Sequence, residues 1–294
     1  MEQLSYEKIL QDLEQFLQLC SSIRLQERTG RFTQYHREIV ALMDAIKTRS
    51  LSGQDEEQLD KYRVALMEGM EVSLLLPYLL QCEPPAVSPK LKACLRGPFM
   101  PNDETPTSHQ NHPRNIQFEL FLASILWRSG FQPVLGEHPD IKCRVENKWF
   151  FFECKRLFST SPQSLRDRIR EAAGQIRKNR TKAPPGTRGI IAISLARIFN
   201  PSQAALHMLN EQQGRDEIAM WLRHKADEVR DAWEPLFHKK IVGIFFYAAS
   251  AFENFEADFY TYGRHFIGHL LTQKGSRDEI AVRKLVEAME ATRY

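Results

Sequence analysis

The fold is decided by one stretch, residues 139–155, which reads Pro-Asp-Ile-Lys-Cys-Arg-Val-Glu-Asn-Lys-Trp-Phe-Phe-Phe-Glu-Cys-Lys. An aspartate opens a run with strand-like alternation, and a second, more apolar run ends in Glu-Cys-Lys. Two such runs joined by a short polar segment predict a β-hairpin. The hairpin would carry two carboxylates and one amine near its open end.

The register of this hairpin is predicted from its loop. We take Asn147 and Lys148 as a two-residue loop, because asparagine tolerates the left-handed backbone conformation. Directly opposed side chains share a face of the sheet, so Asp140, Glu153 and Lys155 gather on one face. A slip by one residue would mix polar and apolar side chains on both faces. The opposite, apolar face comprises Ile141, Cys143, Val145, Phe150, Phe152 and Cys154.

The three polar residues are suited to one kind of chemistry. Asp140 and Glu153 offer the hard oxygen ligands that Mg²⁺ or Mn²⁺ prefers. Such an ion lowers the pKa of a bound water and offsets charge that develops on a phosphate. Lys155 is expected to orient the attacking water or to stabilise the transition state. The set therefore predicts metal-dependent hydrolysis of phosphodiesters.

The string Pro-Asp followed by Glu-x-Lys resembles the PD-(D/E)xK, or restriction-endonuclease-like, nuclease superfamily. The helix–strand–strand–strand–helix–strand order expected over residues 115–198 is similar to the core of that superfamily. The resemblance implies a glutamate on the preceding helix as a further metal ligand, a place that Glu119 fits. It also implies a polar residue on the following helix, with Gln175 as the first candidate and Asn179 as the second. Residues 1–110 are not covered by it.

The order of elements predicts the α/β (α+β) class, with a central mixed sheet flanked by helices in a restriction-endonuclease-like core. Apolar residues with helical spacing predict an all-helical module over residues 1–82, in which Pro77 ends or kinks the third helix. Residues 83–114 contain seven of the fifteen prolines, which predicts a linker or extended coil. The nuclease-like domain is expected over residues 115–294.

Within this last range we expect four helices and six strands. The helices are predicted at 115–129, from about 162 onward, at 215–233 and at 277–291, and the strands at 132–137, 141–146, 149–157, 189–196, 240–247 and near 259–268.

The charge of the chain is informative through its distribution. A formal net charge of +3 does not by itself indicate a nucleic-acid partner. Residues 164–190, however, hold eight basic and two acidic residues. Such a stretch is commonly a solvated helix face, but beside a phosphodiesterase site we expect it to contact phosphates. The expected nucleic-acid contacts are Arg166, Arg170, Arg177, Lys178, Arg180 and Lys182.

Other classes of protein are disfavoured. The longest apolar stretch, residues 72–80, is far shorter than the ~20 residues that span a bilayer. The first residues lack the basic and apolar segments of a signal peptide, so we expect a cytoplasmic protein with no membrane association. Five scattered cysteines without a Cys-x-x-Cys pair predict reduced thiols.

These observations predict a metal-dependent nuclease with Mg²⁺ or Mn²⁺ as cofactor and nucleic acid, expected to be DNA, as substrate. Asp140, Glu153 and Glu119 are the expected metal ligands, and Lys155 and Gln175 complete the catalytic set. The N-terminal helices are expected to bind a protein partner, a second copy of the chain or the substrate. Two alternatives remain: a non-catalytic nucleic-acid-binding or assembly protein on the same fold, and a protein-interaction module with a structural hairpin. The sequence leaves open DNA or RNA, and endonuclease or exonuclease action.

Overall fold

The computed structural model describes residues 5–25, 30–104, 112–181, 183–201, 206–208, 210–254 and 259–292. The chain divides into two compact units, which differ from the three ranges expected from the sequence. Unit 1 comprises Met1–Ser124, Asn200–Met208 and Ser250–Tyr262, and unit 2 comprises Ile125–Phe199, Leu209–Ala249 and Gly263–Tyr294.

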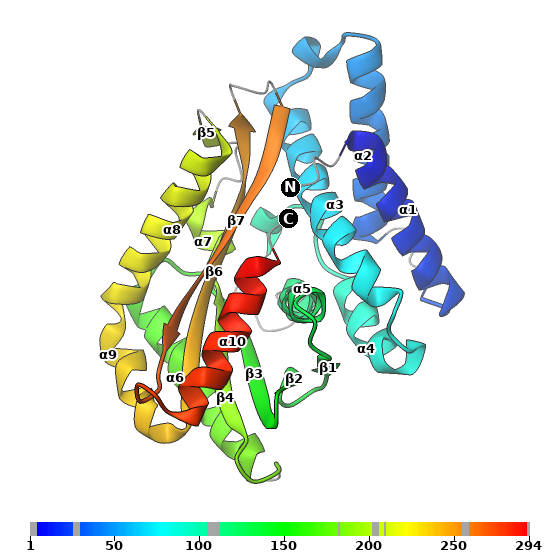
Figure 1. Ribbon diagram of the computed structural model, residues 1–294. Helices are drawn as coiled ribbons and strands as arrows, with labels where there is room; N and C mark the ends of the chain where they lie inside the picture. The colour runs from blue at the N-terminus through cyan, green and yellow to red at the C-terminus, as the bar shows by residue number, and fades with distance from the viewer. Residues whose placement is uncertain are drawn as a thin grey trace. The chain divides into compact units, whose positions relative to one another are not determined.

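Figure 1 shows helices and strands alternating along the second half of the chain. The α-helices are α1 (Tyr6–Ser22), α2 (Arg31–Lys47), α3 (Glu56–Leu79), α4 (Pro84–Cys94), α5 (His112–Arg128), α6 (Pro162–Arg180), α7 (Ala196–Phe199), α8 (Glu211–Glu228), α9 (Arg230–Trp233) and α10 (Arg277–Ala291). The strands are β1 (Val134–Leu135), β2 (Ile141–Val145), β3 (Lys148–Arg156), β4 (Arg188–Ser194), β5 (Leu206–Met208), β6 (Ile241–Asn254) and β7 (Phe259–Leu270). Short 3-10 helices lie at Leu51–Gly53, Pro101–Asp103 and Glu234–Lys239.

Unit 1 is built on the three N-terminal helices, which pack against one another. The side chains of Ser5 and Asp55 cap α1 and α3 by accepting hydrogen bonds from backbone N–H groups of the first turn. A side chain at Gly69 of α3 would lie 2.6 Å from Ile9 of α1, so glycine allows these two helices to approach closely. The expected helical character of this region is confirmed.

A network of buried charges lies inside unit 1. Arg114 donates hydrogen bonds to Glu68 (2.8 Å), to Glu104 (3.0 Å) and to the Tyr35 hydroxyl (2.8 Å). The guanidinium of Arg31 lies 3.7 Å from the same Glu68 carboxylate. Burial opposes ionisation of Glu68, but Arg114 and Arg31 outweigh it and lower the pKa of Glu68 to about 2. Both signs of charge are therefore compensated within the core.

The proline-rich segment differs from the expectation of a linker or extended coil, because Pro84–Cys94 form helix α4. Val87, Leu91 and Cys94 are buried. Prolines in a first helical turn lose no hydrogen bond, because the N–H groups there have no partner within the helix. Pro77 differs in position, because it lies near the C-terminal end of α3, which ends two residues later. Part of the predicted segment, residues 105–111, lies outside the described residues.

The strands form one mixed, open sheet with the order β1-β2-β3-β4-β6-β5, and β7 pairs with β6. β1, β2 and β3 are antiparallel neighbours, whereas β3, β4 and β6 run parallel. This confirms an α+β fold with a central mixed sheet and an N-terminal helical region. β5 pairs with the far end of β6, at Phe252–Asn254, in unit 1. No helix in the described part of the chain is long and apolar enough to cross a membrane.

One face of the sheet in unit 2 is covered by α6, which packs against β3 and β4. Gly189 of β4 is paired with Phe151 of β3, and a methyl group at Gly189 would overlap the side chain of Ile176 in α6. The missing side chain of Gly189 thus lets α6 lie close to the strands. This face also carries Glu153, two residues beyond Phe151.

Helix α10 covers the opposite face. Val282 of α10 lies next to Gly243 of β6, and Gly243 is paired with Ile190 on the face opposite Gly189. Asp278 of α10 forms an ion pair with Lys148 at the start of β3. The expectation that helices cover both faces is therefore confirmed for unit 2.

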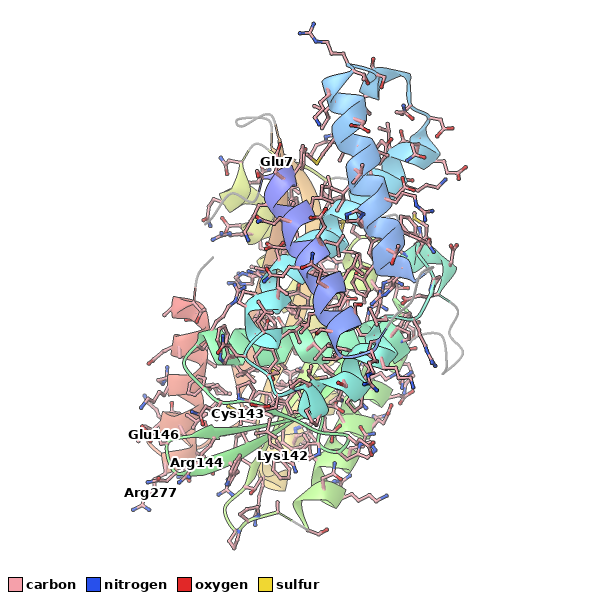
Figure 2. All side chains as sticks on the ribbon, turned by 90° about the vertical axis from the view of Figure 1, so that its right-hand side faces the viewer. Glu7, Lys142, Cys143, Arg144, Glu146 and Arg277 are labelled. Atoms are coloured by element: carbon pink, nitrogen blue, oxygen red, sulfur yellow. The ribbon has the colours of Figure 1, made fainter. Side chains whose placement is uncertain are left out.

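The register of the β2–β3 hairpin differs from the predicted one by two residues. Val145 pairs with Lys148 and Ile141 with Phe152, so the loop consists of Glu146 and Asn147. Glu146 adopts the left-handed conformation (φ 54°) that such a loop requires. Figure 2 shows Glu146 at the same end of unit 2 as Arg277, and Glu146 pairs with Lys284 of α10 at 2.9 Å.

A shift of two residues preserves which side chains share a face, because side chains alternate with a period of two. The predicted apolar face is therefore confirmed: Ile141, Cys143, Val145, Phe150, Phe152 and Cys154 are all buried. The neighbours across the hairpin change, however. The observed register, continued by one residue beyond Ile141 and Phe152, brings Asp140 opposite Glu153 instead of Lys155.

Candidate metal site

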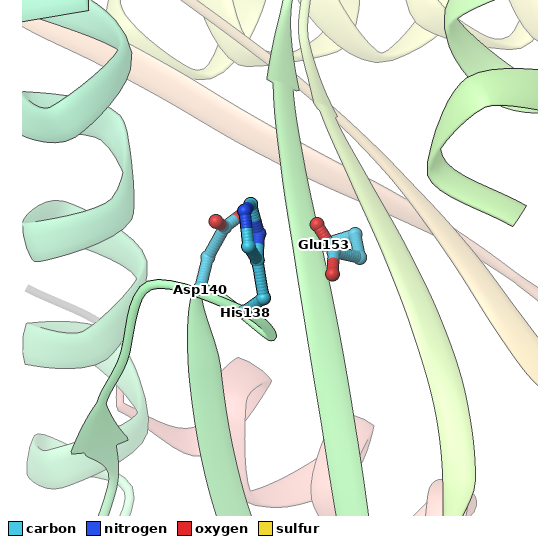
Figure 3. A group of neighbouring side chains, drawn as sticks. All are labelled: His138, Asp140 and Glu153. Carbon is cyan, nitrogen blue, oxygen red and sulfur yellow. The ribbon is translucent and has the colours of Figure 1, made fainter. Parts of the chain in front are cut away.

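Three potential ligands gather where β2 begins. One ligand atom from each of His138, Asp140 and Glu153 lies within 4.8 Å of the other two. Figure 3 shows His138 and Asp140 at the entrance to β2 and Glu153 on the neighbouring strand β3. Asp140 and Glu153 are buried, whereas His138 is exposed. The structure thus brings together two of the three predicted metal ligands and adds a histidine.

Asp140 is held by backbone groups on both sides. Its Oδ2 accepts a hydrogen bond from the backbone N–H of Cys154 (2.7 Å), which ties the carboxylate to β3. Its backbone carbonyl accepts a hydrogen bond from the N–H of Gly136 (3.0 Å). A Cβ at Gly136 would lie 2.7 Å from the carbonyl oxygen of Pro139, so this tight turn requires glycine.

Glu153 is fully buried in β3 and is only partly compensated. Its Oε1 accepts a hydrogen bond from Asn179 Nδ2 of α6 (2.9 Å), whereas its Oε2 is buried and has no hydrogen-bond partner among the described residues. Burial and the neighbouring Asp140 carboxylate raise the pKa of Glu153 to about 8, although Lys155 and Asn179 act in the opposite direction. The ionised form of Glu153 is therefore only partly stabilised by its surroundings.

Lys155 forms an ion pair with Glu171 of α6. Its ammonium group lies 3.2 Å from Glu171 Oε1. The side chain of Lys155 is mostly buried and that of Glu171 is partly exposed. Lys155 still favours the ionised form of Glu153 through its charge, so it remains close enough to act electrostatically at the site.

Helix α6 presents a stripe of polar residues to β3. Glu171, Gln175 and Asn179 are spaced four residues apart, so they lie on one side of the helix. The first contacts Lys155 and the last contacts Glu153, which places Gln175 between these two contacts. Gln175 Oε1 is buried and has no hydrogen-bond partner within the described structure. Asn179, the second candidate in the sequence, is thus the residue that donates to Glu153.

Glu119 belongs to unit 1, in helix α5. It is buried and forms an ion pair with Lys90 of α4. It is not a member of the group formed by His138, Asp140 and Glu153. Its role as a metal ligand stays a prediction.

The predicted nucleic-acid contacts fall into three groups. Arg166 and Arg170 pair with the acidic neighbours Asp231 (3.1 Å) and Asp167 (3.3 Å). Arg177 and Lys178 are exposed near the end of α6, and Arg177 Nε donates a hydrogen bond to a backbone carbonyl of the preceding turn. The side chain of Arg180 and the whole of Lys182 lie outside the described residues. Phosphate binding by these six residues stays a prediction.

His138 was not among the predicted site residues, since a loop histidine is more often inert. A signal was available, because His138 lies two residues before the aspartate that opens β2. The resulting set of one nitrogen and two carboxylate donors fits a divalent cation. The buried, unpartnered Glu153 Oε2 supports this fit, because burial of a carboxylate without a partner is strongly unfavourable.

Comparison with known proteins adds no assignment. No family model matches the chain, and no match is found among curated proteins or among solved structures. The function is therefore inferred from the residues of the site and from the fold that positions them.

Proposed function

We propose that the chain is a metal-dependent nuclease with a restriction-endonuclease-like core, which hydrolyses phosphodiester bonds, with DNA as the expected substrate. One observation carries the proposal. Glu153 has an oxygen that is buried and unpartnered, and this carboxylate lies beside Asp140 and His138. A divalent cation held by these groups supplies the missing positive charge.

The fold supports this reading of the site. Asp140 lies at the start of one strand and Glu153 and Lys155 on the next, within a mixed sheet covered by helices on both faces. This arrangement fits the Pro-Asp and Glu-x-Lys pattern of the nuclease superfamily. The observed register strengthens the fit, because it brings Asp140 opposite Glu153.

Each residue then has a distinct task. When bound, Mg²⁺ or Mn²⁺ supplies Lewis-acid activation of a water and of the scissile phosphate. Asp140 and Glu153 hold the cation, and the Cys154 N–H and the Asn179 amide fix the orientation of the two carboxylates. Lys155 donates hydrogen bonds to the attacking water or to a phosphate oxygen. Glu171 keeps the ammonium group of Lys155 oriented until substrate binds.

The proposed substrate follows from charge near the site. Arg177 and Lys178 are exposed on α6, the helix that also carries Asn179. Exposed cations beside a hydrolytic site favour a phosphate backbone as ligand. Binding through the backbone predicts weak sequence dependence and strong salt dependence.

Nuclease assays of the purified full chain test the proposal. Supercoiled plasmid, linear duplex, single-stranded DNA and RNA are incubated with Mg²⁺ or Mn²⁺. We expect Asp140→Ala and Lys155→Ala each to lower the rate by about 10³-fold, since removal of one charged group at the reacting centre costs about 3–4 kcal/mol in comparable sites. Glu290→Ala, a change at an exposed carboxylate of α10, is the control and should retain full activity.

Two results would contradict the proposal. Undiminished cleavage by both the Asp140 and the Lys155 variants would remove these residues from catalysis. Salt-sensitive DNA binding without cleavage in any divalent metal would instead support the alternative of a non-catalytic nucleic-acid-binding protein.

A further inference from the structure

The position of His138 has a consequence for the choice of metal. A ring nitrogen of His138 lies within 4.8 Å of ligand oxygens of both Asp140 and Glu153. The two carboxylates are buried and the imidazole is exposed, so the histidine occupies the solvent side of the group. Among the described residues His138 forms no hydrogen bond and no ion pair. Its imidazole is therefore free to coordinate.

We infer that His138 is the third protein ligand of this site and that it makes the site prefer Mn²⁺ to Mg²⁺. The inference rests on the proposed function, since it concerns the same cation. It goes further by naming a ligand that the Pro-Asp and Glu-x-Lys pattern does not contain, and by naming the ion that this ligand selects.

Mg²⁺ and Mn²⁺ differ in how well they accept a nitrogen ligand. Mg²⁺ binds oxygen donors and gives up its waters reluctantly, so an imidazole nitrogen adds little to its affinity. The first-row transition ions accept imidazole far better, and Mn²⁺ among them shares the preference of Mg²⁺ for carboxylates. A site of one nitrogen and two carboxylate oxygens is therefore better matched to Mn²⁺. Two carboxylates and a neutral imidazole also balance the charge of one divalent ion.

Exposure of the histidine makes the inference testable. Substitution of His138 removes no buried contact, so the fold should be retained. Substitution of Asp140 removes a ligand that is tied to β3 through Cys154 N–H. His224, an exposed histidine of α8 that pairs with Glu228 (2.9 Å), offers a matched control outside the group.

The experiment measures Mn²⁺ binding to the metal-free full chain by electron paramagnetic resonance, with Mg²⁺ as competitor and no nucleic acid present. We expect one Mn²⁺ per chain, and displacement by Mg²⁺ only at a concentration more than about tenfold higher. His138→Ala should weaken Mn²⁺ binding by about tenfold or more and change Mg²⁺ binding by less than about threefold. His224→Ala should change neither. Electron spin echo spectra of protein with ¹⁵N-labelled histidine should show coupling of the bound ion to an imidazole nitrogen.

The outcomes separate this inference from the proposed function. Binding that is lost in Asp140→Asn but unchanged in His138→Ala, without nitrogen coupling, overturns the role of His138 and leaves the carboxylate site standing. Displacement of Mn²⁺ by an equal concentration of Mg²⁺ overturns the selectivity. Binding that survives Asp140→Asn places the ion elsewhere and overturns the metal site itself.

Discussion

Glu68 in unit 1 and Glu153 in unit 2 are both buried carboxylates, yet their surroundings shift their pKa values in opposite directions. Glu68 accepts hydrogen bonds from Arg114 and Gln117 and lies 3.7 Å from Arg31, and its pKa falls to about 2. Glu153 accepts one hydrogen bond from a neutral amide, and its pKa rises to about 8.

Under the proposed function, the difference is one between a structural carboxylate, Glu68, and a metal-binding one, Glu153. A buried carboxylate that only stabilises the fold is surrounded by cations supplied by the same chain. A buried carboxylate that binds an external cation has fewer of them, so its ionised form remains unfavourable until the ion binds. Perturbed carboxylates of the second kind cluster at functional sites. This contrast makes opposite predictions for the same substitution at the two positions.

The largest effect is expected from Glu68→Gln. This change leaves Arg114 and Arg31 buried without their shared carboxylate, and loss of one partner from a buried ion pair costs about 3–5 kcal/mol. The unfolding free energy, measured by urea denaturation at pH 7, should fall by that amount. Glu57→Gln, which removes an exposed ion pair with Lys61, should leave stability nearly unchanged. Equal effects of the two substitutions would erase the proposed distinction.

The penalty of Glu68→Gln should depend on pH in a defined direction. A carboxyl whose pKa is lower in the folded state contributes stability that is complete above the unfolded value of about 4.5 and is lost as the pH falls towards 2. The difference in unfolding free energy between the wild type and Glu68→Gln should therefore become smaller below about pH 4.5. A difference in unfolding free energy that stays constant down to about pH 2 would contradict the lowered pKa of Glu68.

Glu153→Gln is expected to act in the opposite sense in the metal-free protein. The pKa of Glu153 is higher in the folded state, so its stabilising contribution is complete below about pH 4.5 and is lost as the pH rises through 8. A neutral glutamine can keep the bond from Asn179 and avoids the buried negative charge. At pH 9 the variant should be more stable, by on the order of 2 kcal/mol.

The measurement for Glu153→Gln is urea denaturation in the presence of a chelator at pH 4 and at pH 9. At pH 4 the variant and the wild type should have nearly the same unfolding free energy, since both side chains are then neutral. Saturating Mn²⁺ should stabilise the wild type and not the variant. Destabilisation of the chelated variant at pH 9 would mean that Glu153 is a structural charge like Glu68.

A smaller effect is expected where α6 approaches the sheet. A methyl group at Gly189 would overlap Ile176, so Gly189→Ala should lower stability by about 1–3 kcal/mol through overpacking. It should also displace the helix that carries Asn179. Ile176→Ala in the same chain should relieve the overlap, so that the two changes together cost less than their sum. Gly174→Ala, at a position in α6 with room for a methyl group, should stabilise the chain slightly.

Much of the fold could be predicted from the sequence where one local signal dominates. The bounds of α10 agree with the prediction, because Ser276 is a good N-cap and the apolar spacing is regular. The two faces of the hairpin were predicted because alternation alone determines them. The register of the hairpin was predicted incorrectly, because Glu146-Asn147 and Asn147-Lys148 are both acceptable loops. The choice between them depends on packing against the neighbouring elements.

The site was predictable to the extent that its residues follow one another along a strand. Asp140 and Glu153 lie close together because β2 and β3 are neighbours in the sheet and the two side chains are on the same face. His138 lies before the strand, in a turn whose backbone conformation depends on the close contact between Gly136 and Pro139. The alternation of polar and apolar residues carries no information on the conformation of such a turn. The ion pair between Glu119 and Lys90 joins two helices, and spacing along the sequence carries no information on such a contact.

The smallest expected effect concerns Asn179, whose neutral side-chain amide donates a hydrogen bond to Glu153. Removal of this donor should raise the pKa of Glu153 further, because the hydrogen bond favours the ionised form. Metal binding requires that form, so Asn179→Ala should weaken Mn²⁺ binding at pH 7 by about tenfold. The deficit should shrink at pH 9 and above, where the carboxylate is ionised in both proteins. Gln175→Ala, one turn earlier and without a bond to Glu153, should show neither the deficit nor its pH dependence; equal losses in the two variants would assign Asn179 to helix packing instead.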